Sequence, residues 1–440
     1  MSRLLLVCAV LVAILSSSAQ AEIQVNVRTS GAQANSAVAL DARGGAVVVW
    51  SSYYSTAGRS NDIVARRLDA TGTPVGDEFI VNVLNEGNQT APALAMGRQG
   101  RFAVVWQGPG IEEDIFLRMY DPQDMPSADD LLVNLDAEGR QLQPRVAAGG
   151  EDLFVIAWES VETVEDGNRT FVYAHLFDPN GTGLGDDILV DPNLYDCRYP
   201  DVAMDAQGNF VVTWMRDRSS HPIMARLFDP NGVPRTEVFP VSTAAIASVT
   251  QPSIAMNAHG YFLIVWDGDP NRASDDDIHA RRYDPNGAPQ GEPFVVNTIR
   301  AGAQQWPQAA INDANEFVVV WEHDTADPNT ATNIFARRFA EDGLPRGEET
   351  RLNTCTADKQ RYADVALTAE GSFIATWESN DQDSSGYGVF AHFEPPIDPN
   401  EAATVPDGSE SDPNGSEVTP VEPEPDPDES PTDPNGLPGE

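Results

Sequence analysis

A run of apolar residues that ends in tryptophan recurs along the chain at a nearly constant interval. Successive tryptophans of this series are 56, 52, 56, 52, 55 and 56 residues apart, and only Trp306 lies outside it. The series consists of Trp50, Trp106, Trp158, Trp214, Trp266, Trp321 and Trp377. A regular period of this length indicates seven copies of one small structural unit.

Each repeat contains four short segments with the character of β-strands. In the fifth repeat these are residues 252–258, 261–266, 277–283 and 292–297, which are rich in branched and aromatic side chains. None of them extends to the ten or more residues that an amphipathic helix would need. The pattern therefore predicts an all-β protein built from four-stranded units.

The connections between these segments fall into two groups. The third and fourth segments are joined by Asp-Pro-Asn-Gly at residues 178–181, 229–232 and 284–287, a sequence typical of a tight type I turn. The first and second segments are joined as tightly, for example by residues 41–45. The connections after each tryptophan and after each fourth segment vary, and in a four-stranded meander they emerge together. We call this end of the fold the variable face.

Seven four-stranded units of this length predict a β-propeller, because radial repetition leaves only short edges. A solenoid is the competing architecture, but it needs polar capping repeats, and the terminal repeats resemble the middle ones. The seventh repeat supplies only three strand segments before it reaches Glu394. The segment from Glu22 to Asn26 resembles the missing fourth strand, so we predict that the N-terminal strand completes blade seven.

Residues outside the repeats define the expected domain boundaries. Residues 1–21 carry Arg3, an apolar run from Leu4 to Leu15 and a small-residue cleavage site, which together indicate a secretory signal peptide. Residues 22–394 form the propeller. Residues 395–440 contain thirteen acidic residues, no basic ones and many prolines, a composition typical of a disordered tail. We expect a secreted protein, which is extracellular, at the cell surface or periplasmic, with no membrane insertion.

The charge balance narrows the range of partners. The chain has 27 basic and 68 acidic residues, a net charge of −41, so an interaction with nucleic acid is not expected. Only two cysteines, Cys197 and Cys355, follow the predicted signal peptide. Because they enter blades that lie nearly opposite each other in a seven-fold ring, we predict two free thiols.

The repeat motifs resemble a repeat found in secreted bacterial proteins that are often large and surface-associated and mostly lack a defined function. The motifs are FVVVW at residues 317–321, NIFARRF at 333–339, PQGEPFVVNT at 289–298 and QPSIAM at 251–256. The resemblance spans the whole propeller. It implies a structural repeat and carries no catalytic residues over to this chain.

Two repeated positions are expected to serve the fold. We interpret the seven tryptophans as core residues between blades and not as a platform for sugars. The third segment of each repeat carries a basic residue, and we predict that it pairs with a neighbouring carboxylate or carbonyl group and does not form an anion-binding ring. These residues are Arg66, Arg118, His175, Arg226, Arg281, Arg337 and His392.

Acidic residues are the main candidates for chemistry on the variable face. Glu159, Asp267, Glu322 and Glu378 directly follow a tryptophan. In the acidic stretch 267–277 the first three ligand positions have the spacing of a calcium loop, but Arg272 and Ile278 replace its glycine and its bidentate glutamate. A solvated acidic loop is the default interpretation. The candidate metal ligands are Asp267, Asp269, Asn271 and Asp275.

No nucleophile elbow and no zinc-protease motif occurs, so the sequence predicts no catalytic residue and no cofactor apart from possible calcium. The leading hypothesis is a monomeric, non-catalytic propeller whose variable face binds an extracellular protein or glycan. The candidate binding residues are Tyr53, Tyr54, Asp267, Asp269, Trp306 and Tyr362. One alternative is an extracellular polysaccharide hydrolase or lyase with its site at the channel mouth. Another is a structural component of the cell envelope.

Overall fold

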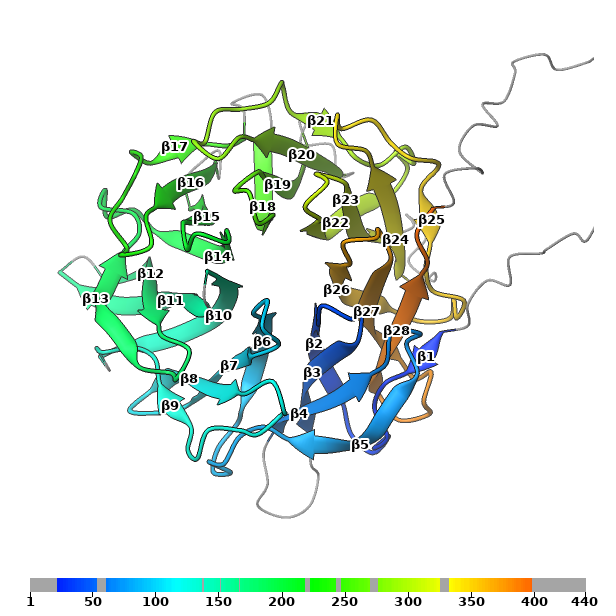
Figure 1. Cartoon of the computed structure of the whole chain (residues 1–440), viewed down its shortest axis with the longest axis horizontal. Helices are drawn as coiled ribbons and strands as arrows, with labels where there is room; N and C mark the ends of the chain where they lie inside the picture. The colour runs from blue at the N-terminus through cyan, green and yellow to red at the C-terminus, as the bar shows by residue number, and fades with distance from the viewer. Residues whose placement is uncertain are drawn as a thin grey trace, which may run out of the picture. The chain divides into compact units, whose positions relative to one another are not determined.

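The computed structural model of the chain describes residues 22–53, 61–136, 138–150, 152–165, 167–217, 222–242, 247–269, 276–324 and 332–397. The predicted signal peptide, Asp398 to Glu440 of the predicted tail, and several loop residues lie outside these ranges. Residues up to Ile397 belong to one compact unit. Within the described ranges the chain forms 28 strands, arranged as a ring of seven blades (Figure 1).

In each blade the four strands lie side by side, in order from the central channel to the rim. The innermost strands are β2 (Gln33–Leu40), β6 (Thr90–Met96), β10 (Arg140–Gly149), β14 (Cys197–Met204), β18 (Ala247–Met256), β22 (Ala303–Ile311) and β26 (Gln360–Leu367). The second strands are β3 (Ala46–Tyr53), β7 (Phe102–Pro109), β11 (Leu153–Val164), β15 (Phe210–Arg216), β19 (Phe262–Asp269), β23 (Phe317–Asp324) and β27 (Phe373–Asn380). The third strands are β4 (Asn61–Leu68), β8 (Glu113–Tyr120), β12 (Gly167–Phe177), β16 (Ile223–Phe228), β20 (Asp277–Tyr283), β24 (Thr332–Phe339) and β28 (Tyr387–Glu394). The outer strands are β5 (Pro74–Ile80), β9 (Leu131–Leu132), β13 (Gly183–Leu189), β17 (Phe239–Pro240), β21 (Phe294–Val295), β25 (Thr350–Arg351) and β1 (Ile23–Gln24).

The N-terminal strand closes the ring, as the sequence predicts. Strand β1 pairs antiparallel with β28, with Ile23 opposite Ala391 (Figure 1). The pairing continues past the strand, because Val25 N donates to Val389 O at 2.9 Å and Val389 N donates to Asn26 Oδ1 at 2.9 Å. The seventh blade is therefore assembled from both ends of the propeller sequence.

The repeated tryptophans form the core between blades. All seven are at most 1% exposed, and each lies in an apolar cluster that combines its own blade with the preceding one. In five blades the indole Nε1 donates to the side chain of a glutamine 17 residues earlier, at 2.8 to 3.2 Å. These contacts confirm that the tryptophans serve the core and are not exposed for a ligand.

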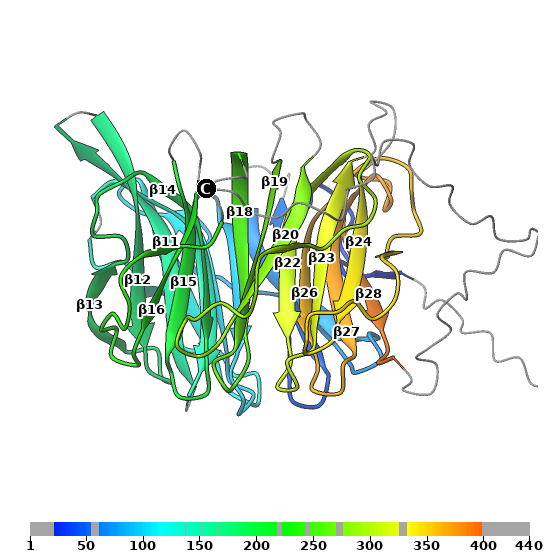
Figure 2. The ribbon, with the colours of Figure 1, turned by 90° about the horizontal axis from the view of Figure 1, so that it is seen from above.

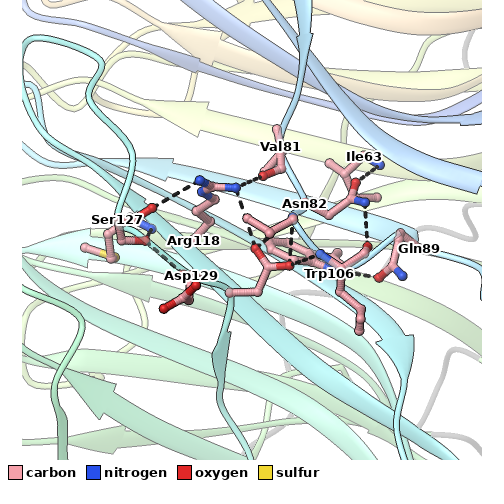
Figure 3. Close-up of polar contacts among 12 residues, drawn as sticks. Ile63, Val81, Asn82, Gln89, Trp106, Arg118, Ser127 and Asp129 are labelled. Atoms are coloured by element: carbon pink, nitrogen blue, oxygen red, sulfur yellow. Dashed lines mark hydrogen bonds and ion pairs between the residues drawn. The ribbon is translucent and has the colours of Figure 1, made fainter. Parts of the chain in front are cut away.

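The basic residue of the third strand links neighbouring blades. Arg118 Nη1 donates to Val81 O of the preceding blade at 2.6 Å (Figure 3). Arg66 Nη1 donates in the same way to Val25 O at 2.8 Å. Arg226, Arg281 and Arg337 make the same contact with Val190, Val241 and Val296. The two histidines bond a carboxylate of their own blade instead, His175 with Asp187 and His392 with Glu394. The predicted structural pairing is confirmed at all seven positions.

The asparagine that follows this valine in most repeats also has a backbone role. Asn82 Oδ1 accepts from Ile63 N at 2.7 Å, and Asn82 Nδ2 donates to Asp62 Oδ1 at 3.0 Å (Figure 3). The side chain thereby continues the strand pairing after the short outer strand has ended. The Val-Asn motif is therefore explained by structure.

The predicted turns occupy the face opposite the variable face. In the turn after β12, Gly181 N donates to Asp178 O at 3.0 Å, and Gly181 has a φ of 81°. This backbone conformation is one that glycine adopts at little cost. Among the described strands of the variable face, β11 and β12 of blade three form the longest hairpin (Figure 2).

The structure also places the two cysteines. Cys197 is the buried first residue of β14, whereas Cys355 follows β25, and both are free thiols. Among the described residues no helix is long and apolar enough to span a membrane.

Removal of the closing strand should destabilise the ring. A chain that begins at Val27 loses the burial of Val25, worth about 2 kcal/mol, and several buried hydrogen bonds worth about 1 kcal/mol each. We therefore expect the free energy of unfolding to fall by on the order of 3–5 kcal/mol, and the exposed edge of β28 to promote aggregation. Denaturant unfolding measures the first effect, with the exposed Val27→Ala as control. An unchanged unfolding midpoint in the shortened chain would contradict closure by β1.

Candidate functional site

Each innermost strand contains a bulge close to the variable face. The register with the second strand shifts at the same place in all seven blades, for example between Leu142 and Arg145. In five blades the bulge contains a proline, which fits a position where the strand pairing is interrupted. We call the bulge residues that surround the channel at this level the channel mouth: Asn35, Ala91, Gln143, Tyr199, Gln251, Trp306 and Tyr362.

The backbone at the channel mouth has an unusual conformation. Asn35, Ala91, Gln143, Tyr199, Trp306 and Tyr362 have positive φ angles of 49° to 56°. For bulky residues this region is disfavoured by on the order of 1–3 kcal/mol, and such residues cluster at functional sites.

Acidic residues that follow the repeated tryptophans hold three of these bulges in place. Glu159 Oε1 accepts from Tyr199 N at 2.7 Å, and Glu322 Oε1 accepts from Tyr362 N at 2.6 Å. Glu378 accepts from Asn35 N in the same way across the closure of the ring. Each carboxylate thus fixes the bulge of the next blade, and the channel mouth is part of the network that connects the blades.

These acidic residues do not begin the loops of the variable face, as the sequence suggested. Glu159, Asp267, Glu322 and Glu378 lie inside second strands and are at most 7% exposed. Asp269 is equally buried at the end of β19. The expectation was wrong because the second strands continue past the tryptophan. Hydrogen bonds to the next blade satisfy the side chains of Glu159, Glu322 and Glu378, which the sequence alone presents as exposed.

The channel mouth opens into a cavity of about 520 Å³ that is lined by the innermost strands. Two residues below each bulge, five blades carry a polar side chain, and blades one and two carry Ala37 and Ala93. We call these five residues the polar arc: Arg145, Asp201, Ser253, Gln308 and Asp364. At this level the wall of the cavity is therefore polar over five consecutive blades and lined by alanine in the other two.

The two carboxylates of the polar arc connect blades through their oxygen atoms. Asp201 Oδ2 accepts from Ile254 N at 2.9 Å, and Asp364 Oδ2 accepts from Val38 N at 2.8 Å. The hydroxyl of Ser253 donates to Gln308 Oε1 at 3.0 Å. Backbone groups of the next blade thus orient the arc, and the cavity wall is preorganised.

Burial changes the acidity of these groups. Burial raises the pKa of Asp364 to about 6, although the N–H groups of Val38 and Val365 and the charge of Arg145 act in the opposite direction. Burial also raises the pKa of Asp201, and Arg145 again opposes the shift. Burial also raises the pKa of Glu322, which bonds Tyr362 N of the channel mouth, to about 8.

Aromatic side chains gather on one side of the channel mouth. The rings of Trp306 and Tyr362, on neighbouring blades, meet edge to face with centroids 5.2 Å apart. Arg361 lies over the ring of Tyr362 at 4.9 Å and over that of Tyr387 at 3.9 Å, while its Nε donates to Glu378 at 3.2 Å. Trp306 and Tyr362 are half-buried and line the cavity.

The structure brings together only part of the predicted site. Trp306 and Tyr362 were expected on the variable face and lie in contact at the channel mouth. Tyr53, at the end of β3, is exposed but does not line the cavity. Tyr54, Asn271 and Asp275 lie outside the described residues. The described residues contain no cluster of three or more histidine, cysteine or acidic side chains that could hold a metal ion.

The sequence interpretation missed Tyr199, Arg145, Asp201 and Asp364. One signal in the sequence could have located them. Tyr199 directly precedes the proline that recurs in the innermost strands, and the other three directly follow this proline or the residue equivalent to it. The residue before the proline varies between aromatic, amide and small types, and the residue two places later varies between basic, acidic, other polar and small types.

No protein-family model matches the chain, and no curated protein matches it. Solved structures with a similar fold include an ulvan lyase solved with a GlcA(1-4)Rha3S fragment, with 9% identity, a TM-score of 0.53, and coverage of 85% of this chain and 96% of the lyase. The chain has the β-propeller fold.

Two further structures extend this comparison. A fungal alcohol oxidase in complex with copper has 13% identity and a TM-score of 0.52, with coverage of 86% of this chain and 77% of the oxidase. A protein of unknown function from Dyadobacter fermentans has 12% identity and a TM-score of 0.50, with coverage of 70% and 94%. Because folds are shared by proteins of unrelated function, these similarities concern the architecture alone.

The buried Glu322 should make stability depend on pH. Its pKa is about 8 in the folded chain against an ordinary value of 4.5, so the folded state holds a proton that the unfolded state has lost between these pH values. Its contribution to stability therefore falls as pH rises from 4.5 to 8, by at most about 1.4 kcal/mol per pH unit.

We expect Glu322→Gln, which keeps an acceptor for Tyr362 N, to lose this part of the dependence. Denaturant unfolding at pH 5 and pH 8 measures it. The free energy of unfolding of the variant minus that of the native chain should be larger at pH 8 than at pH 5. Glu370→Gln, in an exposed turn on the opposite face, serves as control. Parallel pH profiles for Glu322→Gln and the native chain would show that Glu322 is ionised in the fold.

Proposed function

We propose that the protein is a secreted, non-catalytic propeller that binds a glycan at the channel mouth. The observation that carries this proposal is the pair formed by Trp306 and Tyr362. Both side chains line a cavity, both stand on backbone in a disfavoured conformation, and they contact each other from different blades.

The fold does not require aromatic residues at these positions. Ala91 and Asn35 adopt the same backbone conformation at the equivalent places of blades two and one. The repeated tryptophans, by contrast, are all buried. A half-exposed aromatic pair that the architecture does not need supports a role in binding, because aromatic rings provide large, rigid contact surfaces for the apolar faces of sugar rings.

The rest of the cavity provides the polar half of such a site. Gln143, Gln251 and Gln308 line it with amide groups that donate and accept hydrogen bonds. A volume of about 520 Å³ lies within the usual range for small-ligand pockets. Amide groups and aromatic rings around one cavity suit a ligand that has both hydroxyl groups and apolar C–H faces, as a glycan has.

The hydrogen bonds of the two half-buried carboxylates of the polar arc favour binding over catalysis. Asp201 and Asp364 each accept two backbone N–H groups, one of them from the next blade. A carboxylate engaged in this way holds the ring together. It is poorly placed to exchange a proton with a ligand, since proton transfer requires direct contact with the reacting atom.

A polysaccharide hydrolase or lyase is the second candidate. The pKa of Asp364, raised to about 6, is suited to a general acid. The ulvan lyase named above, which has a similar fold, is a polysaccharide lyase. Release of reducing ends or unsaturated products from a polysaccharide panel would favour this candidate, provided that Asp364→Asn abolishes the release.

The N-terminal sequence and the charge support an extracellular glycan and not a nucleic acid. The apolar run from Leu4 to Leu15 precedes a small-residue cleavage site, as in exported proteins. The net charge of −41 repels phosphate backbones. The resemblance of the repeats to secreted bacterial repeat proteins is in agreement with this location. Self-association without any ligand would instead favour a structural envelope component.

Substitution of either aromatic residue should weaken glycan binding. We expect Trp306→Ala and Tyr362→Ala each to lower the affinity for a glycan identified from an oligosaccharide panel by about 5- to 150-fold, because each removes about 1–3 kcal/mol of ring contact. Isothermal titration calorimetry measures the affinity. Tyr261→Ala is the matched control, since Tyr261 is 39% exposed on the opposite face. Unchanged affinity in both aromatic variants would overturn the proposal.

A further inference from the structure

Arg145 is the one basic residue of the polar arc, and most of its donors are unused. Its Nη1 donates to Pro144 O at 3.0 Å, and this is its only hydrogen bond among the described residues. Its Nε lies 4.0 Å from Asp201 Oδ1, the outer limit of an ion pair, and the side chain is 34% exposed. A guanidinium group has five N–H donors, so several of them remain available to a ligand.

The neighbouring carboxylates do not depend on these donors. Both oxygens of Asp201 and both oxygens of Asp364 accept backbone N–H groups at 2.8 to 3.0 Å. Burial raises the pKa of Asp201, on the next blade, and that of Asp364, on blade seven, and the charge of Arg145 opposes the shift at both. Arg145 lines the cavity together with both carboxylates, and its side chain is 34% exposed, so an entering ligand would meet the guanidinium group.

The repeat itself does not require an arginine at this position. The equivalent residues of the other blades are Ala37, Ala93, Asp201, Ser253, Gln308 and Asp364. The arginines that connect blades stand instead on the third strands, where their Nη1 atoms bond the valine carbonyl of the preceding blade. Arg145 therefore has no structural role that its repeat position demands.

We propose that the glycan bound at the channel mouth carries a carboxylate, as a uronic acid does, and that Arg145 binds this carboxylate. The inference rests on the proposed glycan-binding function and adds the class of sugar. A guanidinium group and a carboxylate are matched in shape and can form two parallel hydrogen bonds. Trp306 and Tyr362 would contact the sugar ring, and Ser253 and Gln308 lie on the same wall for its hydroxyl groups.

The overall negative charge does not oppose this interaction at short range. At physiological ionic strength, exposed charges more than about 8 Å away are largely screened, whereas a contact inside a cavity is screened much less. The net charge of −41 should slow the approach of an acidic glycan without removing the local attraction to Arg145.

The test compares glycans that differ only in their carboxyl groups. Oligomers of galacturonate, of mannuronate and guluronate, and of glucuronate-containing glycans are each paired with their carboxyl-reduced, neutral forms. Calorimetry gives the affinity of the full chain for both members of each pair. We expect at least one carboxylated member to bind at least tenfold more tightly than its reduced form, and Arg145→Gln to abolish this difference.

Two further variants separate the possible outcomes. Arg145→Lys should keep part of the preference, since it retains the charge but not the paired donors. Arg198→Gln is the control, because Arg198 is an exposed arginine next to the channel mouth that pairs with Asp217 at 3.6 Å; it should leave the preference unchanged. Thermal melting confirms that each variant is folded.

If the reduced forms bind as well as every carboxylated form, and binding still depends on Trp306, the role of Arg145 is overturned. The glycan-binding function then remains intact. A carboxylate preference that persists in Arg145→Gln would also overturn the role of Arg145 and leave the glycan-binding function intact. Glycan binding that is insensitive to both Trp306 and Arg145 would overturn both proposals.

Discussion

The burial of one apolar interface between each pair of neighbouring blades is the constraint on which this structure depends. A single four-stranded blade leaves its tryptophan partly uncovered, and only the adjacent blade can cover it. Seven such interfaces exist only if the ring closes. The last one joins Val25 of the N-terminal segment to Trp50 of blade one, within a cluster that also contains residues of β28. The link from Arg66 to the carbonyl group of Val25 crosses the same interface.

The polar contacts between blades build the channel. Glu159, Glu322 and Glu378 fix the bulges of the following blades, while Asp201 and Asp364 fix the strands below them. Groups that secure the ring therefore also determine the position of the side chains around the cavity. A site of this kind is rigid before a ligand arrives, which reduces the entropy lost on binding.

The repeats separate structural positions from positions that are free to vary. Tryptophan is constant because every blade buries it against its neighbour, and the basic residue of the third strand is an arginine in the five blades where it bonds the preceding blade. At the channel mouth and in the polar arc, each blade contributes a different residue, since the backbone makes the bulge with aromatic, amide or small side chains alike. The propeller architecture therefore does not require the aromatic pair Trp306 and Tyr362 or the positive charge of Arg145. These residues are particular to this chain.

The sequence by itself determined the all-β class, the seven blades, the closure by Glu22 to Asn26, and the structural roles of the tryptophans and the third-strand basic residues. Local periodicity and turn chemistry carry this information within each repeat. It also indicated Trp306 and Tyr362, but it assigned Asp267 and Asp269 to a loop, whereas both are buried in β19. Only the tertiary structure brought Arg145, Asp201 and Asp364 into one cavity. These residues come from blades three, four and seven, and their proximity arises from the closure of the ring, which no spacing within a single repeat expresses.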